Sequence, residues 1–194
     1  MDYLSEAVLG SPQATEDVIA WMWQTGALVM GESAGQWKID LEPARPALEL
    51  WKTMVADDKV VSPDSFGGSV DLFAGFPLGS FSMMQTGCWS RRLIAEAKPS
   101  FQWQVVPLPH NKLHVNSNEP QTWSITAQTT AHGSANAAWE VVEWMSNKDN
   151  QTEVAFGDGL LPTRQSAMKD ARFNTEENGW KVVQNEVQHG KPYP

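Results

Sequence analysis

Residues 73–89, with the sequence FAGFPLGSFSMMQTGCW, contain the pattern that decides the fold. The stretch 80–84 is apolar and partly alternating, which predicts a short strand. Gly87 ends this stretch, because glycine allows the backbone to turn tightly. Residues 89–96 then have the composition of a helix, so the sequence predicts a strand, a turn and a helix that begins at Trp89.

Periodic apolar residues on both sides of this stretch predict further helices. The expected helices cover residues 13–25, 43–57, 135–146, 150–156, 162–168 and 175–188. Two further strands are expected at 103–106 and 123–127, and a polar loop is expected at 110–121. Strands that alternate with helices in this way predict an α/β fold with more helix than strand.

Composition and charge exclude several classes of protein. Hydrophobic residues make up 41% of the 194 residues, which is enough for a packed core. The net charge is -9 and the densest basic cluster is Arg91-Arg92, so no nucleic-acid partner is expected. No run of 18 apolar residues occurs, which predicts no membrane-spanning helix. Residues 1–6 have neither the basic nor the apolar region of a signal peptide, so none is expected in this chain.

The histidines and the single cysteine do not form a recognisable metal or nucleophile motif. His110 and His114 are four residues apart, a spacing that would align them as metal ligands on a helix. They lie instead in the predicted polar loop, where only Glu119 is a nearby acidic residue, so no metal site is predicted. Cys88 has no histidine near it in sequence, and we expect it to be a small buried apolar side chain.

No catalytic or cofactor motif is present, so no catalytic residue and no cofactor is predicted. One enzymatic alternative stays open, a small hydrolase or lyase acting on carbohydrate. It would need two carboxylates at one cleft. The possible pair is Asp158 and Glu119, which are far apart in sequence.

Tryptophan is unusually frequent, with ten residues in the chain. Tryptophans pack in cores, but they also form flat faces on which the apolar C–H faces of sugar rings stack. At the predicted helix start, Trp89 lies beside backbone N–H groups that have no partner within the helix. An aromatic face next to free donors suits a polyhydroxylated ring.

The order of features from residue 18 to about residue 192 resembles that of the family 1 bacterial extracellular solute-binding proteins, the sugar-binding relatives of maltose-binding protein, and seven blocks carry the likeness. The most specific block runs from Phe73 to Trp89. It is similar to the family pattern Phe-x-x-Gly-Lys-x-Ala-Met-x-x-x-Gly-x-Trp, with a longer spacer after Phe73 and with Ser82 before the methionine. The other six blocks are residues 23–27, 47–51, 105–109, 123–125, 137–145 and 159–164.

The resemblance implies an α/β, helix-rich lobe of the type II periplasmic-binding-protein fold, incomplete because the first lobe is largely missing. Residues 12–106 and 149–194 would form the C-terminal lobe. Residues 107–148 would be the inter-lobe crossing and a segment of the N-terminal lobe, and residues 1–11 stay unassigned.

The resemblance also implies a function. The chain would be part of the substrate-binding component of an ABC transporter, which binds a sugar or oligosaccharide for import and docks on a membrane permease. The full-length family member would be periplasmic, or extracellular and lipid-anchored. The alternative is a truncated, non-binding fragment that acts only as a structural or interaction domain.

The family pattern implies which residues would contact the ligand. Trp89 would stack on the sugar, with Trp123 and Gln121 in the cleft beside the inter-lobe strand. Asp158 and Arg164 would offer charged hydrogen bonds, and Trp23 is a weaker member of the set.

One consequence concerns the helix 135–146, which would lie in the first lobe without its usual neighbours. We expect it to expose Trp139, Val142 or Met145, unless it docks on a second chain or on the remaining lobe. Exposed apolar faces of this kind drive association, so self-association through this helix is expected.

Overall fold

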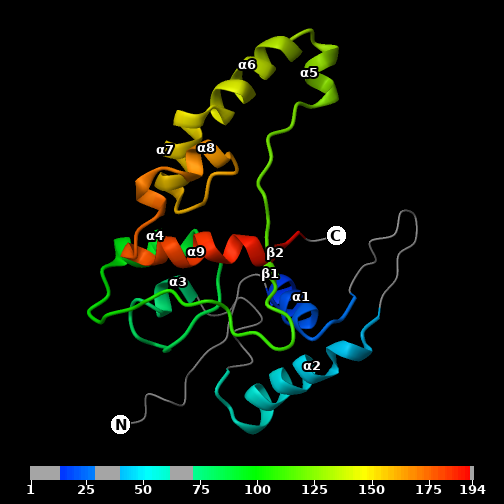
Figure 1. Ribbon diagram of the computed structural model, residues 1–194, viewed down its shortest axis with the longest axis vertical. Helices are drawn as coiled ribbons and strands as arrows, with labels where there is room; N and C mark the ends of the chain where they lie inside the picture. The colour runs from blue at the N-terminus through cyan, green and yellow to red at the C-terminus, as the bar shows by residue number, and fades with distance from the viewer. Residues whose placement is uncertain (1–13, 29–39, 62–71, 193–194) are drawn as a thin grey trace.

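The computed structural model describes residues 14–28, 40–61 and 72–192 of the chain. At one end of the molecule lie α1 (Ala14–Gln24) and α2 (Arg45–Lys52). The middle contains α3 (Leu72–Gly75), α4 (Ser90–Ala97) and α9 (Trp180–Glu186), followed by α7 (Lys148–Asp158) and α8 (Gln165–Met168). The helices α5 (Ala127–Ala131) and α6 (Ala135–Ser146) project from the far end (Figure 1).

Short helical turns complete the helical content of the described residues. They are η1 (Glu42–Ala44), the π-helical turn η2 (Thr53–Asp57), η4 (Ala171–Phe173), η5 (Glu177–Gly179) and η6 (Val187–His189). The helices predicted from apolar periodicity are confirmed, as is the helix predicted after Gly87. Within the described ranges, no helix is long and apolar enough to span a membrane.

The predicted strands are wrong. In the described part of the chain, the only strands longer than one residue are β1 (Asn116–Ser117) and β2 (Gly190–Lys191), which pair in parallel, and β1 lies inside the predicted loop. Residues 80–84, 103–106 and 123–126 form no ladder there. A strand needs a hydrogen-bonded neighbour, and no described segment supplies one. The fold is therefore helix-rich, with far less strand than the α/β pattern predicted.

Segments that the sequence predicted as strands are held by side chains instead. Phe81 is 5% exposed and packs against Phe76 and Met84. Trp21 of α1 donates a hydrogen bond from Nε1 to Oε1 of Gln85, at 2.9 Å. This side-chain hydrogen bond, and not a sheet, thus joins the irregular segment before α4 to α1.

A second core joins α7 to the beginning of α9. Ala155, Phe173 and Trp180 are buried together. The rings of Phe156 and Trp180 are stacked, with centroids 5.4 Å apart, and Phe173 meets Trp180 edge-on at 5.0 Å. Aromatic pairs at such separations contribute beyond simple burial of apolar area, so this cluster fixes how α9 starts against α7.

Arg91 connects α4 to this aromatic cluster. Its side chain is only 4% exposed, and its guanidinium lies 3.8 Å from the ring centroid of Trp180. It donates hydrogen bonds to the carbonyl oxygens of Cys88 at 2.8 Å, Gly159 at 2.6 Å and Asn178 at 3.1 Å. Among the described residues Arg91 forms no salt bridge, and burial lowers the pKa of its guanidinium. The carbonyl dipoles and the ring face compensate the buried charge.

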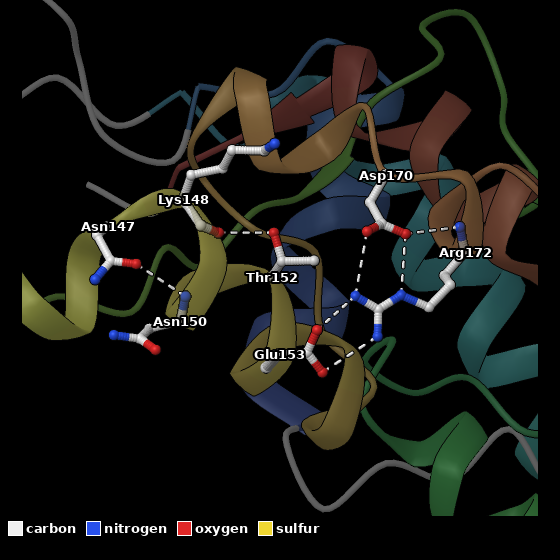
Figure 2. A network of polar contacts seen from close by, with 7 residues as sticks. All are labelled: Asn147, Lys148, Asn150, Thr152, Glu153, Asp170 and Arg172. Carbon is white, nitrogen blue, oxygen red and sulfur yellow. Dashed lines mark hydrogen bonds and ion pairs between the residues drawn. The ribbon is translucent and has the colours of Figure 1, made fainter.

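Polar contacts fix the start and the middle of α7 (Figure 2). At its start, Asn147 caps the helix by accepting a hydrogen bond from the backbone N–H of Asn150, at 2.9 Å. Farther along, Arg172 pairs with both Glu153 and Asp170. The hydrogen bonds from Arg172 lower the pKa of both carboxyl groups. Their small stabilising effect is present at neutral pH and is lost as the pH falls through these lowered pKa values.

The arm formed by α5 and α6 stands apart from both cores. None of the 12 residues of α6, all of which the structure describes, is buried. Trp139 is 58% exposed and Trp144 is 60% exposed, while Val142 and Met145 are half-buried. The exposure expected for Trp139 is therefore observed. The assignment of residues 107–148 to another lobe stays a prediction.

The contacts of Arg91 predict a large difference between two neighbouring arginines. Arg91→Met keeps an apolar stem but removes the donor to the buried carbonyl oxygen of Gly159 and the contacts to Asn178 and Trp180, so it should lower the free energy of unfolding by about 2 kcal/mol. The control is Arg92→Met, because Arg92 is exposed and, in the described part of the chain, its one ion pair is with Glu96 four residues on. The control substitution should lower the free energy of unfolding by less than about 0.5 kcal/mol. Urea denaturation measures both, and equal effects would contradict the role given to Arg91.

Candidate functional site

Trp89 is the N-cap residue of α4, just before the first turn of the helix. Its indole ring is half-buried and packs against Phe73, with ring centroids 4.8 Å apart and planes at 50°. Part of the ring therefore stays accessible while the rest is held in place. This is the arrangement that a stacking platform for a ligand requires.

Gly87 gives the indole room. A Cβ at position 87 would lie 2.8 Å from Cδ1 of Trp89, closer than real atoms approach. The backbone of Gly87 does not adopt a positive φ. The glycine is therefore required by the close approach of the ring, and not by the tight turn that the sequence suggested. Ser90, 1% exposed, closes the turn with hydrogen bonds from its N–H and its Oγ to the carbonyl oxygen of Gly87.

The chain after α7 packs directly on the backbone of Trp89. Gly159, with φ +72°, ends α7 in the left-handed conformation that favours glycine. A Cβ there would lie 3.2 Å from the carbonyl oxygen of Trp89. Asp158 immediately precedes Gly159 and is exposed. The structure thus brings Trp89 and Asp158 into the same neighbourhood, although they are far apart in sequence.

Arg164 has a different neighbourhood from the one that the family pattern implied. Its Nε donates to the carbonyl oxygen of Ser146 at 3.0 Å, and its backbone N–H donates to Oε1 of Gln151 at 2.7 Å. These contacts tie the beginning of α8 to the junction of α6 and α7. In the described part of the chain, no observed contact joins Arg164 to Trp89.

Trp123 and Gln121 lie on the extended segment that connects β1 with α5 (Figure 1). Both side chains are exposed, Trp123 by 62%. Trp23 is the opposite case, because it is 3% exposed in α1 and lies under Lys191, whose Nζ is 5.1 Å from the ring centroid. As placed here, Trp23 belongs to the core and offers almost no surface to a ligand.

The groups considered for catalysis are also separated. Glu119 is exposed on the extended segment, whereas Asp158 ends α7, and in the described structure no observed contact joins them. Burial raises the pKa of the Cys88 thiol, an effect that Arg91 only partly offsets. Cys88 is accordingly held as a neutral, half-buried side chain.

Sequence reasoning missed one cluster of side chains. His114, Glu186 and His189 offer ligand atoms that all lie within 4.8 Å of one another. The sequence places His110 and His114 four residues apart, but Glu119 is the one acidic residue near them in sequence. The structure supplies Glu186 from α9, 72 residues later in the chain.

Comparisons with known proteins give a consistent family signal. The model of a family described as bacterial extracellular solute-binding protein matches residues 7–179. A lipoprotein of Streptomyces antibioticus, described as uncharacterized and encoded in the oleD 5′ region, is 30% identical over 130 residues. That match covers 65% of this chain and 28% of the lipoprotein.

Solved structures of similar fold include maltose-bound MalE3 of T. maritima, with a TM-score of 0.72 and 19% identity, covering 93% of this chain and 47% of that one. The maltose-maltodextrin binding protein of Alicyclobacillus acidocaldarius has a TM-score of 0.69 and 18% identity, and the match covers 97% of this chain and 52% of that one. An ABC transporter solute-binding protein of Thermotoga lettingae, bound with α-D-tagatose, has a TM-score of 0.62 and 18% identity. This match covers 95% of this chain and 45% of that one. The chain spans about half the length of these structures.

The packing of the indole predicts opposite effects for two glycines. Gly87→Ala should lower the free energy of unfolding by about 1–2 kcal/mol, because the indole must move away from the new methyl group. Gly157→Ala is the control: it lies inside α7, and a methyl group there would meet open space, with no neighbouring atom within 4 Å. It should raise the free energy of unfolding by about 0.5 kcal/mol. Thermal denaturation compares them, and a neutral Gly87→Ala would remove the reason given for this glycine.

Proposed function

The chain belongs to the bacterial extracellular solute-binding proteins, and we propose from this membership that it is part of the substrate-binding component of an ABC importer for a sugar or oligosaccharide. In this proposal the complete protein acts outside the cytoplasmic membrane, as a periplasmic or lipid-anchored protein, and delivers its ligand to a membrane permease. The lipoprotein match supports the location. The fold shared with proteins whose structures contain maltose or tagatose supports the class of ligand.

The observation that carries the proposal is the placement of Trp89. The ring is half-buried, backed by Phe73 and set at the start of α4. A sugar ring offers an apolar face that stacks on an aromatic ring held in this way. Asp158, exposed beside Gly159, is the nearest of the proposed charged partners. Trp123, Gln121 and Arg164 would join only as parts of a larger cleft.

The proposal also assigns the segments of the chain. Residues 12–106 and 149–194 would form one lobe, and residues 107–148 would cross into the other. Two observations support this division: α5 and α6 project from the rest of the molecule, and α6 contains no buried residue among those described (Figure 1). A cleft closed by two lobes would supply the remaining contacts to the ligand.

Binding of maltose tests the role of Trp89. We expect the 194-residue chain to bind with a Kd of about a millimolar, because a single lobe cannot enclose a ligand. Trp89→Ala should weaken binding about tenfold, which corresponds to the loss of one stacking contact. Trp139→Ala is the control, because Trp139 is exposed on the projecting arm.

Calorimetry or ligand-observed NMR measures these affinities, with α-D-tagatose as a second sugar. The proposal fails if Trp89→Ala binds as well as the unmodified chain. It also fails in its account of the lobes if the isolated chain binds either sugar at submicromolar concentration.

A second function, a structural or interaction module, is favoured by the apolar surface of α6. Trp139, Val141 and Trp144 are each about 60% exposed, and groups of exposed aromatic and aliphatic side chains promote association. In this alternative the chain binds no sugar and associates through α6.

Association through α6 has a direct test. The average mass in light scattering should rise with concentration, and the double variant Trp139→Glu, Trp144→Glu should abolish the rise, because charges on the contact face oppose burial. Leu78→Glu is the control: Leu78 is 82% exposed but lies far from α6 in the chain. A mass that rises equally in all three proteins would exclude α6 as the contact.

A further inference from the structure

Two distant segments meet where the short parallel sheet forms. β1 pairs with β2 in the register Asn116 with Gly190 and Ser117 with Lys191. This pairing brings the loop before β1 next to the end of α9 and η6. Three histidines and one glutamate from these segments gather at the junction: His110, His114, Glu186 and His189.

The side chains are in direct contact. Nε2 of His114 lies 2.9 Å from Oε2 of Glu186. The rings of His114 and His189 are stacked, with centroids 3.7 Å apart and planes at 13°. His110 stacks on His114 from farther away, at 4.5 Å. One potential ligand atom from each of His114, Glu186 and His189 lies within 4.8 Å of the others.

Glu186 is held in place from a second direction. Its side chain is 17% exposed, and that of His114 is 29% exposed. Nδ2 of Asn116 donates to Oε2 of Glu186 at 3.1 Å and to its backbone carbonyl oxygen at 3.0 Å. A largely buried carboxylate that faces two imidazoles and is fixed by an amide has the surroundings of a metal ligand.

We propose that His114, His189 and Glu186 bind a divalent transition-metal ion of the Zn²⁺ class. Two imidazole nitrogens and one carboxylate oxygen are a ligand set that suits Zn²⁺ and its neighbours, and a hard ion such as Mg²⁺ prefers an all-oxygen set. Water fills the fourth position, since His110 is exposed and stacks on His114 without reaching Glu186 through any contact observed among the described residues.

Binding requires a small local rearrangement. Ligand atoms around a tetrahedral Zn²⁺ lie about 3.3 Å apart, as follows from bonds of about 2.0–2.1 Å. The ligand atoms now lie within 4.8 Å of one another, and Nε2 of His114 is only 2.9 Å from Oε2 of Glu186, so their separations must even out around the ion. The two stacked imidazoles must also tilt, because parallel rings do not direct their lone pairs at one ion. The ion replaces the hydrogen bond between His114 and Glu186, and Asn116 keeps its bond to the carboxylate.

The consequence for the molecule is a link between the loop before β1 and the end of the α9 region. These two segments are otherwise joined by a two-residue ladder and a few side-chain bonds. An ion that binds the folded chain and not the unfolded chain raises the melting temperature. The site would therefore fix the segment that leads toward the projecting arm.

Calorimetric titration of the 194-residue chain with ZnSO₄ tests the site, with Co²⁺ absorption as a second measurement. We expect one ion per chain, visible d–d bands of a four-coordinate Co²⁺ complex, and a higher melting temperature with Zn²⁺. His189→Gln and Glu186→Gln should each weaken binding about 100-fold or more, and Asn116→Ala should weaken it about tenfold. The thermal shift should disappear in the first two variants.

His132→Gln is the matched control, because His132 lies at the end of α5 and is exposed. It should bind Zn²⁺ like the unmodified chain, and circular dichroism checks that every variant is folded. The proposal is overturned if the unmodified chain binds no Zn²⁺ below a millimolar. It is equally overturned if His189→Gln and Glu186→Gln, both folded, bind as the unmodified chain does.

Discussion

The buried guanidinium of Arg91 is the constraint on which the rest of the structure depends. Arg91 is 4% exposed, and a charge buried to this extent is stable only if polar groups of the protein replace the water that it has lost. Its partners are carbonyl oxygens at the start of α4, after α7 and before α9, together with the face of Trp180. Three segments that are distant in sequence must therefore meet at one point, and the aromatic cluster around Trp180 follows from that meeting.

The buried guanidinium of Arg91 also positions the candidate ligand site around Trp89. By fixing the first turn of α4, Arg91 fixes Trp89 two residues earlier. By donating to the carbonyl oxygen of Gly159, it also holds the end of α7, where Asp158 lies, next to α4. Gly87 and Phe73 then set the tilt of the indole. If Trp89 stacks on the ligand as proposed, a ring held in this way loses less entropy on binding than a mobile one. The family membership gives this platform its proposed purpose in carbohydrate capture.

Local patterns predicted most of the helices and few of the long-range contacts. The bounds of α6 agree with the prediction, because its apolar periodicity is a local property of the sequence. The strands failed, since pairing depends on neighbours that periodicity does not reveal. The role of Arg91 could not be predicted either, because two of its partners lie 68 and 87 residues away. The meeting of His114 with Glu186, 72 residues apart, was hidden for the same reason. The family pattern made Trp89 a candidate ligand residue. Trp23 came from the same pattern but is buried, because the pattern alone does not determine how exposed a side chain is.

The most direct measurement is the ¹H–¹⁵N spectrum of the tryptophan indole groups during a titration with maltose. The resonance of Trp89, assigned by its absence from the Trp89→Ala spectrum, should shift progressively with sugar concentration. The resonance of Trp180, buried beneath Arg91, should stay in place. A Trp89 resonance that does not move while those of Trp123 or Trp139 do would contradict the placement of the ligand site at the start of α4.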